Sequence, residues 1–323
     1  MRGAARPVPV ACAVMSVIVR DLRPEVRADA EGFSRVRRLT VPFMLSTPES
    51  VLHDLTHSHP DARFTQLVAE EDGEIIGTAQ VGLAHDSSEP GQGNANIYVH
   101  PERTGRGAGT LLVRTAEERL AALGVRKVYS WVPDEPAGRA FAERRGYRPS
   151  RSAYFLRLDL ANGTLPPLQD PPPGVELRSG ADFADDPHPV FELDAEVTSD
   201  EPGDVDAALT DYQAWLEGTW RHPLLDLDLT TVAVADGRPV AFTLAYTDGA
   251  GRYGTAMTGT ARAHRGRGLA KLAKTASLHR ARAAGCTEAF TGNDTGNEPM
   301  IAVNKWLGYE VCATEVRHVR ELG

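Results

Sequence analysis

The sequence predicts an α/β fold, with a mixed sheet of the α+β kind, that is built twice in tandem. A glycine- and arginine-rich turn occurs at residues 104–109 as TGRGAG (the first turn) and at residues 265–270 as RGRGLA (the second turn). Their central glycines, Gly107 and Gly268, are separated by half the length of the chain. Each copy follows a β-like stretch and opens an amphipathic helix, an order typical of a sheet with helices on its faces and a ligand at the strand ends.

Other landmarks repeat at nearly the same distance. Gly124 and Gly285, each of which ends the helix after its turn, have the same separation as the central glycines. Gly146 and Gly308, each followed by a tyrosine, are only one position further apart than that. A nearly constant offset at several landmarks indicates a duplicated domain.

A proline-rich stretch separates the two copies. Residues 161–174 carry prolines at positions 166, 167, 171, 172 and 173. Proline cannot donate to a strand ladder and stiffens an extended chain, so this stretch is predicted to be a linker. We therefore expect an N-terminal extension over residues 1–16, a first domain over 17–160 and a second domain over 175–323.

The elements of the first half follow from hydrophobic periodicity and from the flanking turn residues. In chain order they are a strand at 17–20, helices at 28–41 and 48–57, strands at 64–69, 75–83 and 95–99, the helix after the turn, a strand at 128–132, a helix at 135–145 and a closing strand at 152–160. The helix after the turn carries Leu112, Ala116 and Leu120 at helical spacing. The second half repeats this order from Val175.

The composition is that of a globular protein, with 41% hydrophobic and 24% charged residues. A formal net charge of −9 argues against nucleic-acid binding, so an anionic ligand needs local positive charge. Arg103 and Arg106 supply such charge at the first turn. At the second turn we expect a cluster of Arg262, Arg265, Arg267, Lys271 and Lys274.

Cysteine spacing, histidine spacing and hydropathy indicate the cellular compartment and whether a metal site is expected. The three cysteines, at positions 12, 286 and 312, show neither disulfide nor metal spacing, which favours a reducing cytoplasm. His53 and His57 are four residues apart without a third ligand in sight, so no metal site is expected. No stretch is long enough to span a bilayer, and residues 7–19 are interpreted as leading into a first strand, with a short signal peptide as the alternative.

Three kinds of phosphate-binding turn compete for the glycine motif, because a glycine turn before a helix leaves backbone N–H groups exposed. A P-loop needs Gly-Lys-Ser/Thr, which neither copy has. A dinucleotide fold needs a third glycine, but Thr110 and Lys271 occupy that position. Arg/Gln-x-x-Gly-x-Gly/Ala between strand and helix is similar to the acetyl-CoA turn of the GNAT N-acetyltransferase superfamily.

The second half carries the fuller resemblance. Arg265, Gly268 and Ala270 match the turn at every defined position, and residues 297–309 look like the next helix of the superfamily, from Asn297 to a final Gly-Tyr. The resemblance implies acetyl-CoA as acyl donor, with its pantetheine arm paired along a strand. The cofactor residues that it implies are Thr258, Thr260, Arg265, Gly266, Arg267, Gly268, Leu269, Ala270, Asn297 and Asn304.

The first half departs from the pattern. Thr104 stands where Arg or Gln is usual, and its last helix has no counterpart of Asn297. Cofactor binding there stays open, and catalysis is expected in the second half. The residues of this possible second cofactor site are Ile97, Val99, Thr104, Gly105, Arg106, Gly107, Ala108 and Gly109.

The resemblance also implies a reaction, in which a neutral amine attacks the thioester directly and a backbone N–H near residues 258–260 stabilises the oxyanion. Many family members place a tyrosine acid four residues before the final glycine, where this chain has Asn304 and, in its first half, Ala142. Neither residue is an acid. A thiol pKa of about 8.5 makes thiolate a tolerable leaving group, so water held by Asn304 is one solution, and the acid is not assigned.

The base is sought in the acidic loop that precedes Tyr212. Glu201 or Asp204 is expected to steer a cationic amine and to relay its proton, with the alternative that Asp204 only caps the following helix.

The resulting hypothesis is acetyl-CoA-dependent N-acetylation of a primary amine on a small molecule. A protein N-acetyltransferase and a non-catalytic acyl-CoA-binding or sensing protein are the alternatives, and the oligomeric state is left open.

Overall fold

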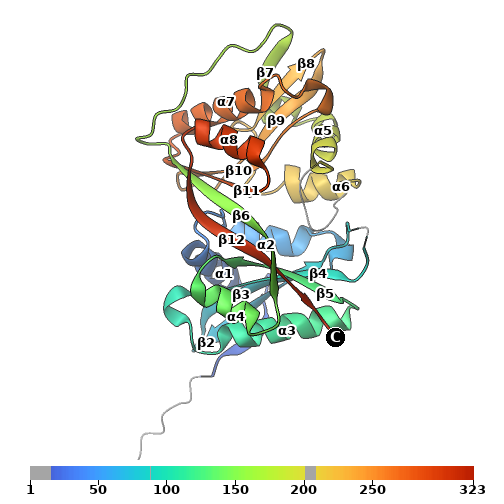
Figure 1. Cartoon of the computed structure of the whole chain (residues 1–323), viewed down its shortest axis with the longest axis vertical. Coiled ribbons are helices and arrows are strands. Elements are labelled where there is room, and N and C mark those ends of the chain that lie inside the picture. The colour runs from blue at the N-terminus through green and yellow to red at the C-terminus, as the bar shows by residue number, and fades with distance from the viewer. Residues whose placement is uncertain (1–15, 88, 201–208) are drawn as a thin grey trace, which may run out of the picture.

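The computed structural model describes residues 16–87, 89–200 and 209–323, which form two lobes of mixed α/β structure (Figure 1). The described strands make one sheet of twelve, in the order β1-β2-β3-β4-β5-β12-β6-β11-β10-β9-β8-β7. Within each lobe the sheet carries helices on both faces. The predicted mixed fold is therefore confirmed.

The elements of the first half lie close to their predicted positions. They are β1 (Ile18–Asp21), α1 (Arg27–Thr40), α2 (Pro48–His57), η1 (Pro60–Ala62), β2 (Thr65–Glu71), β3 (Glu74–Leu83), β4 (Gln92–Val99), η2 (Pro101–Arg103), α3 (Ala108–Ala122), β5 (Lys127–Pro133), α4 (Pro136–Glu143) and β6 (Arg148–Asp159). Helix α2 has its predicted bounds because Thr47 and Ser50 form a capping box and Pro48 occupies its first turn.

The second half repeats the series with small variations. Its elements are β7 (Val175–Ser179), η3 (Gly180–Phe183), α5 (His188–Thr198), α6 (Tyr212–Trp215), the π-helical turn η4 (Leu216–Trp220), β8 (Thr231–Ala235), β9 (Arg238–Thr247), β10 (Arg252–Thr260), η5 (Arg262–His264), α7 (Leu269–Ala283), β11 (Glu288–Asp294), α8 (Glu298–Trp306) and β12 (Glu310–Glu321).

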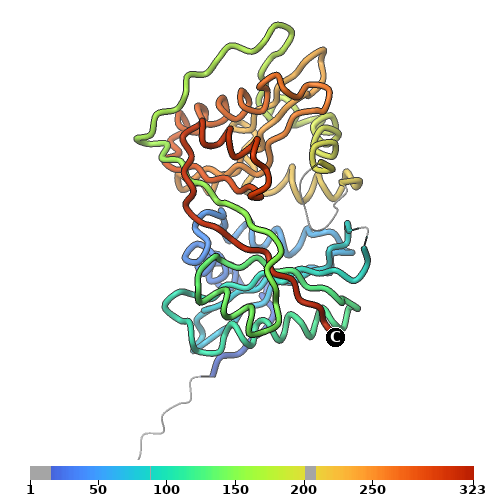
Figure 2. The backbone as a smooth tube through the Cα atoms, in the orientation of Figure 1, coloured from blue at the N-terminus to red at the C-terminus, as the bar shows by residue number. Residues whose placement is uncertain are grey.

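The closing strands of the two halves are exchanged. β6 pairs antiparallel with β11 of the second half, from Ala153 opposite Asp294 to Asp159 opposite Glu288. β12 pairs antiparallel with β5 of the first half and also with β6. Figures 1 and 2 show β6 and β12 crossing side by side between the lobes, with the C-terminus among first-half elements. Each half thus completes the sheet of the other.

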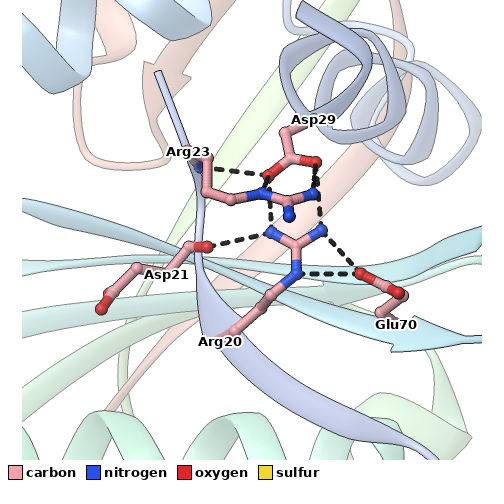
Figure 3. Close-up of polar contacts among 5 residues, drawn as sticks. All are labelled: Arg20, Asp21, Arg23, Asp29 and Glu70. Carbon is pink, nitrogen blue, oxygen red and sulfur yellow. Dashed lines mark hydrogen bonds and ion pairs between the residues drawn. The ribbon is translucent and has the colours of Figure 1, made fainter. Parts of the chain in front are cut away.

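An ion cluster around the buried Asp29 ties α1 to the outer edge of the first-half sheet (Figure 3). Asp29 of α1 lies 2.5 Å from Nη1 of Arg20 and 2.9 Å from Nη2 of Arg23, and Arg20 also binds Glu70 at 2.6 Å. Burial alone raises the pKa of Asp29, but the hydrogen bonds from Arg23 and Arg20 outweigh it and hold the pKa well below its usual range.

Each half contains two parallel strands that part after a short ladder. β4 pairs with β5 only over Gln92–Asn94, and β10 pairs with β11 only over Arg252–Gly254. We call the point beyond Asn94 the first fork and the point beyond Gly254 the second fork. Parted parallel strands leave backbone groups free to meet a ligand, so the forks and the turns that follow them are the places to look for a site.

Candidate functional site

Both glycine turns have the same open backbone geometry. Gly105 and Gly107 have φ of +77° and +91°, and Gly266 and Gly268 have φ of +74° and +75°. Among the described atoms, none lies within 4 Å of a Cβ built on any of these four glycines. Helix α7 starts from Gly268 without a side-chain cap from the described residues, so its first N–H groups are available to an anion. The second turn therefore fits a pyrophosphate.

The charged side chains at the second turn are arranged around Asp200. Arg265 donates to Asp200 at 2.5 Å and to the Thr260 carbonyl at 3.2 Å, and Arg262 also binds Asp200. Hydrogen bonds from Arg262 and then from Arg265 lower the pKa of Asp200 to about 2. In this arrangement the Arg265 guanidinium meets a carboxylate instead of the open amides, and a phosphate has to compete with Asp200 for it.

At the first turn, carboxylates and α4 side chains occupy the corresponding places. Arg106 lies 2.7 Å from the buried Glu71, and Arg103 binds Glu74. Phe141 of α4 lies 3.2 Å from where a Cβ of Gly109 would stand. The guanidinium of Arg145 in turn stacks 3.6 Å from the Phe141 ring. The gap between α3 and α4 is thus bridged.

Lys274 does not belong to the cation cluster predicted at the second turn. Its side chain is buried, with Nζ donating to Oγ1 of Thr291 at 3.1 Å. Burial lowers the pKa of this amine to about 7. The prediction was wrong because Lys274 falls on the face of α7 that packs against the sheet, together with Leu278 and Ala281.

The second fork contains a β-bulge. The register of β10 on β9 shifts between Thr255 and Met257, so Ala256 is the extra residue there. In the described first half, β4 pairs with β3 in one unbroken register from Gly93 to Val99. A bulge leaves a backbone group outside the ladder and re-aims the strand, a device that often lies beside active sites.

Several buried polar atoms of the second half have no hydrogen-bond partner in the described structure. Within the described residues they include Oγ1 of Thr255, Oδ1 of Asn304 and the hydroxyl of Tyr309. Asn304 is fully buried and donates through Nδ2 to Asn293 at 2.6 Å. Unpartnered buried atoms also occur around the first-half sheet, where the described ones include Oγ1 of Thr78 and Oε2 of Glu315, so these atoms alone do not distinguish the second fork.

Asn297 and Thr258 already have local partners. Asn297 caps α8, accepting from the Met300 N–H at 3.3 Å. The Thr258 hydroxyl lies 3.2 Å from that of Thr243 on β9. Glu201 and Asp204 lie outside the described residues. Asp211 is the residue that caps α6, and Trp215 and Trp220 of this region are buried in the core.

Two cavities of about 370 and 290 Å³ lie between the halves and share Asp54, Gln80 and Gly218. The larger one is lined by Asn94 and Asn96 at the first fork. Leu45 lines the smaller one and lies 3.3 Å from where a Cβ of Gly254, at the second fork, would stand. A first-half loop thus covers the second fork, an arrangement that sequence reasoning missed because only the tertiary fold brings the two together.

An imidazole and a carboxylate from different halves meet at these cavities. Nδ1 of His222 accepts from the Leu224 N–H, so Nε2 carries the proton that is shared with Asp54 at 3.2 Å. His53 and His57 stack with ring centroids 4.3 Å apart.

No three His, Cys, Asp or Glu side chains in the described part of the chain are spaced to hold a metal ion. None of the helices in that part is both long and apolar enough to cross a membrane.

Comparison with known proteins agrees with the repeated geometry. The model of the acetyltransferase (GNAT) family matches residues 33–147 and again residues 191–309. Mycothiol acetyltransferase of Nocardia farcinica is 30% identical over 298 residues, 90% of this chain and 95% of the relative. Mycothiol acetyltransferase of Amycolatopsis mediterranei is 28% identical over 265 residues, 79% of this chain and 83% of the relative.

Solved structures share the fold over nearly the whole chain. A tandem GNAT protein from the clavulanic acid biosynthesis pathway aligns with a TM-score of 0.71 at 22% identity, covering 95% of this chain and 99% of its own. A GCN5-related N-acetyltransferase from Sphaerobacter thermophilus gives a TM-score of 0.68 at 22% identity, with 94% and 95% covered. With two family matches placed on the two forks, the chain belongs to the GNAT family of acetyltransferases and is an acyltransferase that uses acetyl-CoA as its acyl donor.

Proposed function

We propose that this protein acetylates a primary amine on a small molecule, and that the reaction takes place at the second fork. The observation that carries this proposal is the β-bulge at Ala256 in the second fork, together with the open glycine turn that follows it. The relatives named mycothiol acetyltransferase act, by their name, on a small molecule, which favours this class of acceptor over a protein.

The second turn would hold the pyrophosphate of acetyl-CoA. The amides from Gly266 to Ala270 face open space, and the N-terminal dipole of α7 favours negative charge there. Arg267 makes no ion pair within the described residues and would bind phosphate directly. Arg265 would join it after leaving Asp200.

The strand edge of β10 would receive the rest of the cofactor. Beyond Gly254 this edge no longer pairs with β11, so backbone groups through Thr258 and Thr260 can bond a pantetheine arm. The bulge at Ala256 would supply the N–H for the developing oxyanion. When bound, acetyl-CoA supplies an activated acetyl thioester.

The acceptor would approach through the cavities between the halves. Asp54 lies at both of them and carries a carboxylate that attracts a cationic amine. Glu201 or Asp204 remains proposed as the residue that steers the amine and relays its proton. If this role is right, kcat/KM falls in Glu201→Gln or in Asp204→Asn, and unchanged kcat/KM in both variants would remove the idea.

A calorimetric titration with acetyl-CoA tests the proposal, because the two turns provide matched variants. We expect one cofactor per chain, at least a hundredfold weaker binding in Gly268→Val, and binding within twofold of the parent in Gly107→Val. Binding that is lost only in Gly107→Val would place the site in the first half. Tight binding without turnover on any of a panel of small amines would favour the acyl-CoA-sensing alternative.

A further inference from the structure

Two opposite charges line the smaller cavity between the halves without meeting each other. Arg37 comes from α1 and Asp54 from α2, and the cavity that both line has a volume of about 290 Å³. In the described structure Asp54 pairs with His222, and no ion pair joins it to Arg37. Opposite charges that share a small cavity and stay apart leave room for a ligand that carries both signs.

The guanidinium of Arg37 is only partly satisfied. It donates to the Gln80 carboxamide oxygen at 2.9 Å and to the Met44 thioether at 3.5 Å, and a thioether is a weak acceptor. Its Cζ lies 5.3 Å from the centroid of the Tyr98 ring. The charge of Arg37 also reaches the buried Glu315, but that carboxyl accepts from the Tyr98 hydroxyl instead. A half-buried cation without a carboxylate partner in the described structure is suited to bind an anion.

Three uncharged donors line the same cavity and have no acceptor among the described residues. One is Nε2 of Gln80, because the bond from Arg37 fixes which end of that carboxamide is the oxygen. The other two are the hydroxyls of Ser46 and Tyr246. An ionised carboxylate only accepts hydrogen bonds, so a guanidinium with three such donors is a suitable set of partners for it.

Asp54 offers one carboxylate oxygen to a ligand. Its Oδ1 accepts from Nε2 of His222 at 3.2 Å, whereas Oδ2 has no partner among the described residues. The side chain of Asp54 is 37% exposed, and the His222 ring that orients it stacks on Tyr246 with 5.1 Å between the centroids. An ammonium group in the cavity can therefore bind Oδ2 without displacing a protein partner.

This cavity adjoins the second fork. Gly254 is the last β10 residue that pairs with β11, and Tyr246 lies opposite it on β9. A Cβ built on Gly254 would stand 3.3 Å from Leu45 and 3.8 Å from Cβ of Tyr246, and both of these residues line the cavity. A molecule in the cavity thus lies beside the strand edge that is proposed to receive the thioester.

We propose that the acceptor is a free amino acid, bound as a zwitterion in the smaller cavity. Arg37 and the three neighbouring donors would bind its carboxylate, and Asp54 its ammonium group. The amino nitrogen forms a bond to the acetyl carbonyl carbon, and the bond between that carbon and sulfur breaks with its electron pair left on sulfur. Of the two protons that the nitrogen loses, one goes to sulfur and the other to water. This inference rests on the proposed function of the second fork and narrows its acceptor to amines that carry a carboxylate.

An amino acid and its amide form a matched pair of acceptors, because the amide keeps the amine and the size but lacks the negative charge. The panel for kcat/KM consists of the common amino acids, β-alanine and 4-aminobutyrate, each measured against its amide. At least one acid should be preferred over its amide by about a hundredfold, since the amide leaves the guanidinium without its anion. Amides that are acetylated as efficiently as every acid would overturn the inference.

Variants of the two charges should separate their roles. Arg37→Met should lower kcat/KM for the preferred acid about a hundredfold and change that for its amide by less than about threefold. Asp54→Asn should lower both about tenfold, because both acceptors carry the amine. The control Arg38→Met changes the exposed neighbour on α1 and should match the parent. An Arg37→Met enzyme that keeps the preference for the acid would overturn the site.

A milder variant keeps the test decisive if Arg37→Met does not fold. Tyr246→Phe removes only a hydroxyl and leaves the ring that stacks on His222. The preference for the acid over the amide should then fall about five- to tenfold, as is typical for the loss of one hydrogen bond to a charged group. An unchanged preference in Tyr246→Phe would overturn the assignment of this donor set to the carboxylate.

Binding provides a readout without turnover and separates the two proposals. Calorimetric titration of the preferred acid into the protein saturated with coenzyme A should show binding that is lost in Arg37→Met and kept in Arg38→Met. A parent that acetylates small amines but none that carries a carboxylate would overturn this inference alone. A parent that binds acetyl-CoA and acetylates no small amine would instead refute the proposed function.

Discussion

The two forks of this protein share a backbone and differ in what fills them. At the first fork, the Asn96 carboxamide accepts from the Trp131 N–H at 2.9 Å, and Tyr98 donates to the buried Glu315 at 3.0 Å. Phe141 closes the adjoining gap against Gly109. At the second fork, β10 carries a bulge on β9, whereas β4 keeps an unbroken register on β3 in the described first half. The duplicated scaffold has kept its shape, and the two copies differ in this bulge and in the side chains beside it.

The buried titratable groups at the two forks also differ in sign. Burial raises the pKa of Glu315 to about 7, and burial lowers the pKa of Lys274 to about 7. The Tyr98 hydroxyl donates to one oxygen of Glu315, and the other oxygen has no partner among the described residues, whereas Lys274 donates to the Thr291 hydroxyl. Each lobe therefore buries a titratable group whose hydrogen-bond partner is an uncharged hydroxyl.

The largest effect is expected from separating the halves. Fragments 1–167 and 168–323, cut within the linker, should not unfold cooperatively when alone, because each lacks the strand that completes its sheet. Expressed together, they should co-purify and recover one thermal transition. Circular dichroism and size-exclusion chromatography provide the measurements. A cooperative transition in either lone fragment would show that the exchange is dispensable and that the halves are independent.

The next largest effect is expected from Asp29→Asn, at the far edge of the first half. Loss of the carboxylate should lower the free energy of unfolding by about 2–4 kcal/mol at pH 7, because two arginines lose their shared partner. The low pKa of Asp29 stabilises the protein above about pH 4, and this contribution is lost as the pH falls further. The gap between parent and variant should therefore close in acid, as denaturant titrations at several pH values will show.

The same variant tests how far the halves are coupled. Because the two halves share their closing strands, the melting transition that acetyl-CoA stabilises and the overall melting transition should shift together in Asp29→Asn. A second half that retains its parental stability in this variant would contradict the continuous sheet.

Glu315→Gln should have a smaller effect of opposite sign. Because the pKa of Glu315 is raised to about 7, the unfolded chain ionises this group before the folded chain does, and the parent loses stability as the pH rises from about 4.5 to 7. The glutamine variant avoids this loss and should be more stable than the parent above pH 7, by up to about 3 kcal/mol. Equal stability of the two proteins at pH 8 would show that Glu315 is not buried as described.

The smallest effect is expected from exchanging Phe141, which bridges the gap between α3 and α4, with its counterpart in the second half. Val303 occupies the place in α8 that corresponds to Phe141 in α4. Val303→Phe should weaken acetyl-CoA binding about tenfold by overfilling the space beside the second turn. The reciprocal Phe141→Val should leave the measured affinity within twofold. Unchanged affinity in Val303→Phe would mean that other side chains distinguish the two forks.

Local signals made much of this architecture predictable. Helix α2 follows from Thr47, Ser50 and Pro48, and both glycine turns adopt the left-handed φ that their glycines suggested. The exchange of β6 and β12 had no such signal, because a strand's own residues do not specify which of two similar edges it will join.

The candidate site, like the fold, could be predicted from the sequence only in part. The open turn and the position of Asn304 could be predicted from motif spacing. The burial of Lys274 and the capture of Arg265 by Asp200 depend on which face of a helix packs and where a distant loop returns. The cavity between the halves depends on Leu45 reaching Gly254, a contact between residues from opposite halves of the chain.

The crossed closing strands have an evolutionary consequence. Once each copy of an ancestral gene product depends on the other for its last strand, neither copy can be deleted without losing both. Selection must then retain the first copy as a scaffold whether or not it keeps a ligand site of its own. The residues of that copy that touch β12 should therefore vary slowly among descendants, while its glycine turn is free to drift.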